Sequence, residues 1–246
     1  MRRLFYKGTM AAVIEITGDD AHHLMHVMRA KEGQEVIVVD AENQVARMAM
    51  SAFREGAVTL TLQERLAADT ESPIALVLAQ CLLKADKMDL VVQKAVELGA
   101  VGVIPVRSQN CVVRYDAKKA AARRGRWQKI ADEAAKQCGR TALLSVAAVT
   151  DLNDFLQQNA ASAETELIFF YENEQDQTVK SYLSQVQAKR IVLLVGPEGG
   201  FSLDEAAAVA AASGHSVTLG PRILRAETAA LTALAVVQYE KGDLGA

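Results

Sequence analysis

The stretch LLVGPEGGFSLDE, residues 193–205, places three glycines and a proline between an apolar run and the start of a helix. The apolar run, 191–195, is hydrophobic without interruption, as in a strand that is buried on both faces of a parallel sheet. Ser202 and Glu205 have the spacing of a capping box, which predicts that a helix begins beside them. The stretch therefore predicts a strand, a loop and a helix of an α/β domain.

Alternation of apolar strands with helices extends over most of the chain around this stretch. We predict strands at 74–81, 101–106, 167–171, 191–195 and 217–220. We predict helices at 84–99, 179–186, 202–213 and 228–242, and a basic helix that runs through Cys138. Such alternation is typical of a parallel sheet that is covered on both faces. The last helix is apolar almost all round. We expect it to be buried on two sides, by the sheet and by either more of this chain or a second subunit.

The N-terminal part of the chain is rich in predicted strands. Residues 56–66 alternate apolar and polar side chains, as a half-buried strand does, and 35–40 and 44–50 are predicted as its neighbours. Residues 19–33 are predicted as a short helix with an aspartate cap at its start and Gly33 at its end. These elements together predict a small barrel-like domain.

A polar segment, 67–73, ends in a proline and separates the two patterns. We therefore expect two domains. The first is the barrel-like domain over residues 1–68, and the second is the α/β domain over residues 74–246.

The composition is that of an ordinary globular protein, with 50% hydrophobic and 23% charged residues among 246 and a formal net charge of −3. No apolar run has the length of a membrane span, and the basic N-terminus lacks the features of a secretory signal. Cys81, Cys111 and Cys138 are far apart, which indicates the reduced thiols of a cytoplasmic protein. His22 and His26 have helical i, i+4 spacing without a suitable third ligand, so we expect no metal.

One segment departs from the slightly acidic average. Residues 114–129 carry seven cations against the single acid Asp116, and they include Trp127. A run of this kind is most often a solvated helix face, but its density beside an aromatic residue is also typical of an RNA-contacting surface. The RNA-binding residues that we predict lie here and at the start of the chain, and they are Arg2, Arg3, Arg123, Arg124 and Arg126.

The glycine loop at 196–200 matches none of the common nucleotide or hydrolase motifs. No lysine follows it as in a P-loop, and it has neither the dinucleotide-binding spacing nor a nucleophile elbow. Glycines can simply relieve strain in a turn between a strand and a helix. Three glycines and a proline in five residues exceed that need, and they also let a flat ligand approach the backbone closely.

A second unusual loop, LGPRILRAETAALTA at 219–233, follows the next predicted strand. Taken alone, Glu227 is explained by the dipole of the last helix, and Arg225 by pairing with a carboxylate. Both loops, however, follow strands of a parallel sheet, and ligands bind beyond the carboxyl ends of such strands. The two loops together therefore predict a binding site.

These two stretches resemble the signature of the RsmE family, the 16S rRNA uridine-N3 methyltransferases of the SPOUT superfamily. Four further blocks resemble the family in its order: RRLFY at 2–6, HHLMHVMRAKEGQEVIVVD at 22–40, LLKADKMDLVVQKAVELGA at 82–100 and IADEAAKQCGR at 130–140. The chain departs from the family at VRSQN, 106–110, where a Ser-Glu-Arg is usual. It also departs at GRTALLSV, 139–146, which lacks a common proline.

The resemblance implies an N-terminal PUA-like barrel, a C-terminal SPOUT domain with a deep trefoil knot, and a symmetric homodimer. It implies bound S-adenosylmethionine, with backbone groups of the two loops around the adenine and glycines leaving room for the ring. The cofactor-binding residues that it implies are Leu194, Gly196, Glu198, Gly199, Gly200, Leu219, Gly220, Ile223 and Leu224. The implied partner is 16S rRNA, either naked or within the small ribosomal subunit.

Methylation of uridine N3 requires that this nitrogen lose its proton. A base can remove the proton, or a cation can stabilise the anion that forms. We assign the cation to Arg225, whereas Glu198 and Glu227 are each either a base or a carboxylate that holds Arg225 or loop amides. Two other functions stay open, a non-catalytic RNA-binding ribosome assembly factor with the same fold and a SPOUT methyltransferase acting on a tRNA ribose.

Overall fold

The computed structural model describes residues 2–67, 70–162 and 164–245 of the chain. These residues form two compact units. One comprises the residues up to Glu71 together with Ala135–Ala142, and the other comprises Ser72–Ala134 and the residues from Leu143 onward. The predicted end of the first domain, residue 68, lies outside the described residues. The sequence pattern does not indicate that a segment from the middle of the chain belongs to the first unit.

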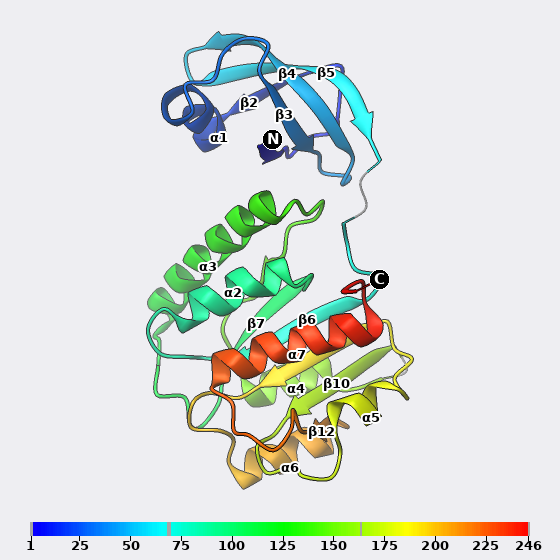
Figure 1. Cartoon of the computed structure of the whole chain (residues 1–246). Helices are drawn as coiled ribbons and strands as arrows, with labels where there is room; N and C mark the ends of the chain where they lie inside the picture. Colours follow the sequence, from blue (N-terminus) through cyan, green and yellow to red (C-terminus); the bar gives the residue numbers. More distant parts are fainter. Residues whose placement is uncertain (1, 68–69, 163, 246) are drawn as a thin grey trace. The chain divides into compact units, whose positions relative to one another are not determined.

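The first unit contains a five-stranded sheet with the order β1-β3-β4-β5-β2 (Figure 1). Its strands are β1 (Arg3–Phe5), β2 (Val13–Thr17), β3 (Glu35–Val39), β4 (Val45–Arg54) and β5 (Ala57–Leu66). The three predicted strands are thus confirmed. Shifts in register between β4 and β5 bend these long strands around a core that includes Leu4, Met48 and Leu60. No pairing joins β1 to β2 among the described residues, so the sheet is a half-barrel, which fits the barrel-like domain that we predicted.

A helix is present within the predicted range 19–33, but it is shorter than predicted and ends before Gly33. Helix α1 (Gly18–His22) continues directly into a π-helical turn, η1 (His23–Val27). The N-cap is Thr17, so the predicted aspartate cap instead lies in the first turn, where Asp19 and Asp20 complement the helix dipole. The helix stops before Gly33 because Arg29 adopts a left-handed conformation, with φ of 49°.

Glu71 ties the segment Ala135–Ala142 into the first unit. Its carboxylate pairs with the guanidinium of Arg140, whose side chain is 5% exposed against 23% for Glu71. The same carboxylate accepts hydrogen bonds from the backbone amides of Thr141, at 2.9 Å, and Ala142, at 3.0 Å. Arg3 donates a hydrogen bond of 2.8 Å to the carbonyl oxygen of Arg140. Three segments that are distant in the sequence are therefore joined by these contacts.

The second unit is built on a parallel sheet with the order β12-β10-β11-β6-β7-β8, in which β9 also pairs with β7. Its strands are β6 (Ala75–Cys81), β7 (Gly102–Arg107), β8 (Ser145–Val146), β9 (Thr150–Asp151), β10 (Thr165–Phe170), β11 (Arg190–Val195) and β12 (His215–Val217). Every pair in this sheet is parallel, which confirms the predicted α/β class. The strand predicted at 217–220 lies earlier in the chain, because the Thr218 hydroxyl bonds to the backbone of Gly220 and begins a loop.

Helices cover the sheet of the second unit. They are α2 (Lys87–Glu97), α3 (Ala117–Cys138), α4 (Leu152–Asn159), α5 (Val179–Leu183), α6 (Leu203–Ala211) and α7 (Ala226–Lys241), and the last turn of α3 belongs to the first unit. The capping box of Ser202 and Glu205 is present at the start of α6. Helix α7 lies beside α2 and packs on β6 and β11 (Figure 1). This chain alone therefore buries α7 on two sides, whereas α4, β8 and β9 are elements that we did not predict.

The sheet order decides which loops meet. Strand β10 lies between β11 and β12, so the two loops singled out in the sequence do not follow neighbouring strands. The loop after β10 stands between them, and β6 adjoins β11 on the other side. Because all these strands are parallel, their carboxyl ends share one edge of the sheet. Four loops, and not two, thus surround the candidate site.

Candidate active site

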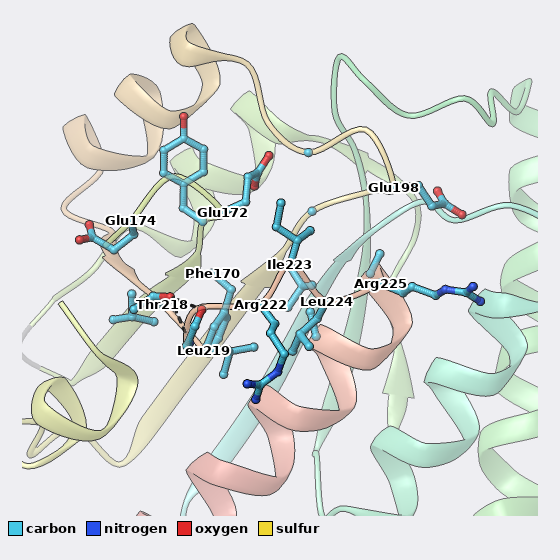
Figure 2. Close-up of a pocket in the computed structure, with 18 of the residues that line it drawn as sticks. Phe170, Glu172, Glu174, Glu198, Thr218, Leu219, Arg222, Ile223, Leu224 and Arg225 are labelled. Carbon is cyan, nitrogen blue, oxygen red and sulfur yellow. Dashed lines mark hydrogen bonds between the residues drawn. The ribbon is translucent and has the colours of Figure 1, made fainter. Parts of the chain in front are cut away.

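A cleft of about 1010 Å³ opens at this edge of the sheet (Figure 2). It is lined by the ends of β10, β11 and β12, by the loops that follow them and by the start of α7. Its volume is in the range of pockets that enclose a small organic ligand. The fold therefore places one large concave site where ligands bind in open parallel sheets.

Most of the predicted cofactor residues line this cleft. They are Gly196, Glu198, Gly199, Gly200, Leu219, Gly220, Ile223 and Leu224, and the predicted cation Arg225 lines it as well. Leu194 does not line the cleft, because its side chain is buried within the sheet, and Val195 takes that place. The predicted Glu227 also lies outside the lining but pairs with Lys87, which borders the cleft.

The glycines of the loop 196–200 are required by neighbouring side chains. A Cβ atom at Gly196 would lie 2.8 Å from the ring of Phe201, and one at Gly199 would lie 3.1 Å from Asn110. Gly200 has a φ of 64°, and a Cβ there would overlap the carboxylate of Glu172. These three glycines therefore let the loop pack closely on its own surroundings.

Gly220, in the loop after β12, is different. Its φ of 117° is one that residues other than glycine rarely adopt, and no atom of the described residues lies within 4 Å of a Cβ built there. The backbone of this loop therefore borders open space inside the cleft. This arrangement lets a flat ring approach the backbone of the loop, where the N–H and C=O of Gly220 are themselves bonded to the Thr218 hydroxyl.

Polar side chains beneath the glycine loop fix its position. The buried Gln80 donates a hydrogen bond of 3.1 Å to the carbonyl oxygen of Gly196. The amide of Asn110 donates to the carbonyl oxygens of Gly199, at 3.1 Å, and Gly200, at 3.2 Å. Asn110 lies in the segment that departs from the family pattern, and it nevertheless braces the loop.

A lysine that we did not predict connects the two loops of the site. The Nζ atom of Lys87, at the start of α2, lies 3.2 Å from Oε1 of Glu198 and 3.0 Å from Oε2 of Glu227. Glu198 also accepts a hydrogen bond of 3.2 Å from the backbone amide of Lys84. Lys84 and Lys87 belong to the sequence block 82–100, which resembles the family. That block is the signal that could have identified them.

The pKa values of this cluster favour its charged forms. Contact with Glu227, supported by Glu198, holds the pKa of Lys87 above its usual value, although desolvation lowers it. Burial by itself raises the pKa of Glu198 and of Glu227, but backbone hydrogen bonds and the charge of Lys87 outweigh burial and lower both. Both glutamates are therefore ionised, weakly basic carboxylates, and Lys87 is their partner.

Arg225 is the N-cap residue of α7, and its side chain is exposed at the cleft. Its guanidinium makes no hydrogen bond or ion pair with another residue that the structure describes. Figure 2 shows Arg225 and Glu198 on one side of the cleft, with Glu172 and Glu174 on the other. Of the two roles expected for these carboxylates, Glu198 accepts from a backbone amide, that of Lys84, and neither glutamate forms an ion pair with Arg225 among the described residues.

The predicted RNA-binding arginines already make contacts within the chain. Arg2 contacts His23, and Arg3 contacts Arg140. On α3, Arg124 donates to the carbonyl oxygen of Val146, Arg126 pairs with Asp89, and Arg123 lies over the ring of Tyr115. Trp127 is buried, so it packs in the core and offers no surface for stacking a base.

Among residues 2–67, 70–162 and 164–245, no group of three or more His, Cys, Asp or Glu side chains could hold a metal ion. No helix there has the length and the apolar character needed to cross a membrane.

Two family models match the chain. The model described as an RNA methyltransferase domain matches residues 70–238, and one described as an RNA methyltransferase PUA domain matches residues 16–50. The ribosomal RNA small subunit methyltransferase E of Bacillus subtilis is 32% identical, and the match covers 98% of this chain and 97% of that protein.

Solved structures agree with these matches. The ribosomal RNA small subunit methyltransferase E of Neisseria gonorrhoeae bound to S-adenosyl methionine superposes with a TM-score of 0.87 at 29% identity, over 99% of both chains. A putative methyltransferase of Legionella pneumophila in complex with the same cofactor superposes with a TM-score of 0.88 at 30% identity, over 98% of both chains. The likeness therefore covers both units of the chain.

Proposed function

The chain belongs to the RNA methyltransferase family and is an S-adenosylmethionine-dependent rRNA methyltransferase, and from that premise we propose that it methylates N3 of a uridine in 16S rRNA of the small ribosomal subunit. The observation that supports this most strongly is the cleft itself. It joins the two signature loops, a backbone open to a flat ring at Gly220, and a free guanidinium at its rim.

The residues present fit the cofactor. The lining holds both carboxylates and arginines, so it can receive both the cationic and the anionic groups of an amino acid. When bound, S-adenosylmethionine supplies a methyl group on a positively charged sulfur. The loops after β11 and β12 would hold the adenosine part, and the remaining task of the protein is to orient the acceptor in line with the methyl group.

Arg225 is proposed to stabilise the uridine anion. The N3 proton passes to solvent or to a base, negative charge spreads onto the carbonyl oxygens of the ring, and N3 then forms its bond to the methyl carbon while the carbon–sulfur bond breaks. A guanidinium without another partner can donate hydrogen bonds to a carbonyl oxygen as this charge develops. Glu198 and Glu227 are poor candidates for the base, because both have lowered pKa values.

The proposal is tested by mapping methylated nucleotides in 16S rRNA. Mass spectrometry of rRNA from a strain that lacks the gene should show the loss of one N3-methyluridine, and the wild-type gene should restore it. Purified protein should methylate naked 16S rRNA or assembled subunits, and assaying both identifies the substrate. A deletion strain with unchanged N3-methyluridine would reject the assigned acceptor, and methylation of a tRNA ribose would replace it.

We further infer the finer features that the family resemblance implies, namely a SPOUT domain with a deep trefoil knot and a symmetric homodimer. Light scattering should give a molar mass twice the 26.5 kDa of one chain. A mass of one chain at micromolar concentration would contradict the dimer.

We also propose that α3 is part of the RNA-binding surface, with Arg2 and Arg3 as further contacts. Each phosphate that a cation neutralises releases counterions, so binding should weaken with salt. Replacing Arg123, Arg124 and Arg126 with alanine should reduce the log–log salt slope by about 0.7 to 0.9 for each phosphate that is no longer neutralised. Filter binding to ribosomal subunits measures this slope, and binding of S-adenosylmethionine should be retained.

A control on exposed cations outside α3 separates specific contacts from a general loss of positive charge. Lys180 and Lys189 are exposed and lie outside α3, so their replacement with alanine should leave the slope unchanged. Arg124 and Arg126 also hold Val146 and Asp89, and circular dichroism must therefore confirm that the triple variant is folded. An unchanged slope in a folded triple variant would remove α3 from the RNA-binding surface.

A further inference from the structure

Lys87 stands where three segments of the chain meet at the rim of the cleft. It begins α2, whereas Glu198 lies in the loop after β11 and Glu227 lies in the first turn of α7. Its Nζ atom reaches both carboxylates, at 3.2 Å and 3.0 Å. One ammonium group with three donors can serve two carboxylates at once. The two glutamates are thus both supplied with a cation.

Glu227 feels the charge of Arg225, and Glu198 shares one side of the cleft with it. Glu227 follows Arg225 by two residues, and the charge of Arg225 contributes to the lowered pKa of Glu227. Glu198 lines the cleft together with Arg225, on the same side in Figure 2. A guanidinium beside a carboxylate readily forms a two-point ion pair. Without Lys87, two ionised carboxylates would therefore stand beside one unpaired arginine.

We propose that Lys87 is a positioning residue for the methyl transfer, which occupies Glu198 and Glu227 so that the guanidinium of Arg225 stays free for the acceptor. This inference rests on the role proposed for Arg225. The site then holds one cation that is paired with carboxylates, Lys87, and one that is available to the acceptor, Arg225. Lys87 acts through Arg225 and need not touch the acceptor itself.

Removal of the Lys87 ammonium group should leave the guanidinium of Arg225 paired with a glutamate and unable to bind the acceptor. In Lys87→Met, the glutamates capture the guanidinium, and the single-turnover rate at saturating cofactor and RNA should fall by about 100-fold, as for loss of one preorganised donor. Lys87→Arg retains a cation and should stay within about threefold of the wild type. Adding Lys87→Met to an Arg225→Ala background should change the rate little, because both changes remove the same interaction.

A rescue variant separates this role from simple bracing of the loops. In the triple variant Lys87→Met, Glu198→Gln, Glu227→Gln, no carboxylate remains to capture Arg225. The glutamine oxygen at 198 can still accept the hydrogen bond from the amide of Lys84. The rate should therefore recover to within about tenfold of the wild type. If Lys87 only braces the loops, the triple variant stays as slow as Lys87→Met, and that result overturns the proposal.

A second readout does not depend on activity. In nitrogen-15 NMR spectra, the Nε–H signal of Arg225, identified by its loss in Arg225→Ala, should exchange more slowly with solvent in Lys87→Met than in the wild type. An unchanged signal in a folded Lys87→Met protein also overturns the proposal. If Arg225→Ala itself leaves the rate unchanged, the role proposed for Arg225 fails. If Arg225→Ala is slow and Lys87→Met is fast, the function stands and only this inference fails.

Discussion

Replacing Arg225 with alanine is expected to slow methyl transfer by about 100-fold or more, the usual cost of removing one preorganised charge from a reacting centre. Arg225 lines the cleft, begins α7 and makes no side-chain hydrogen bond or ion pair with the part of the chain that the structure describes. A guanidinium without a structural partner has little to contribute to stability, so its loss should affect the reaction and not the fold. Single-turnover assays at saturating cofactor measure the rate directly.

Arg222 supplies the matched control. It lies in the same loop, is exposed and lines the same cleft, but it is not at the start of α7. Arg222→Ala should therefore slow the reaction by less than about tenfold, whereas removal of the charge that faces the acceptor has the full effect. The affinity of Arg225→Ala for S-adenosylmethionine should stay close to that of the wild type. A rate within a few-fold of the wild type would show that Arg225 does not stabilise the anion.

The second large effect concerns the fold of the first unit. Glu71→Gln should destabilise that unit by about 3 kcal/mol, because it leaves the buried Arg140 without its carboxylate. The value is at the lower end for a buried pair, since Glu71 itself is 23% exposed. Hydrogen exchange of the amides in β4 and β5, followed by mass spectrometry, reports the stability of this unit. The single tryptophan, Trp127, lies in the second unit and provides an internal reference by fluorescence.

An exposed ion pair of the same unit is the control for this substitution. Arg47 and Glu64 pair at 2.5 Å on the surface, so Glu64→Gln should cost less than about 1 kcal/mol. Equal effects of the two substitutions would show that burial of Arg140 does not matter.

The pH dependence of the Glu71 contribution follows from its pKa. Burial alone raises the pKa of Glu71, but Arg140 and the amides of Ala142 and Thr141 outweigh burial and lower it below 4.5. A carboxyl group whose pKa is depressed on folding stabilises the protein above its unfolded pKa. That contribution is lost as the pH falls through the folded value. The advantage of the wild type over Glu71→Gln should therefore be complete above about pH 4.5 and shrink below it.

The sequence predicts the local structure around the site better than its assembly. Apolar runs, the capping box at Ser202 and the helix 84–99 are properties of consecutive residues, and each lies close to its predicted place. The order of the strands is not such a property. Because β10 lies between β11 and β12, the loop with Glu172 enters the cleft, and nothing in the spacing of the two signature loops indicates this.

The residues that the sequence did not reveal act over long separations. Lys87 lies 3.0 Å from Glu227, although 140 residues separate them in the chain. The resemblance implies Leu194 as a cofactor residue, but side chains alternate in direction along a strand, and its side chain is buried in the sheet while that of Val195 lines the cleft. Periodicity therefore identifies the loops of the site, whereas the contacts between them require the fold.

The first unit is built from two segments that are separate in the sequence, and this sets the order in which its parts are synthesised. Its strands all leave the ribosome early, but Ala142, which donates to Glu71, is made 71 residues after it. At about 5 to 20 residues per second, the nascent half-barrel waits about 4 to 14 s for the segment that completes its hydrogen bonds. Most of the second unit's sheet and all the residues that line the cleft except Lys87 are translated later still. The half-barrel is therefore finished only after the chain has begun its second unit, and it matures as a part of the whole protein and not as an independent N-terminal module.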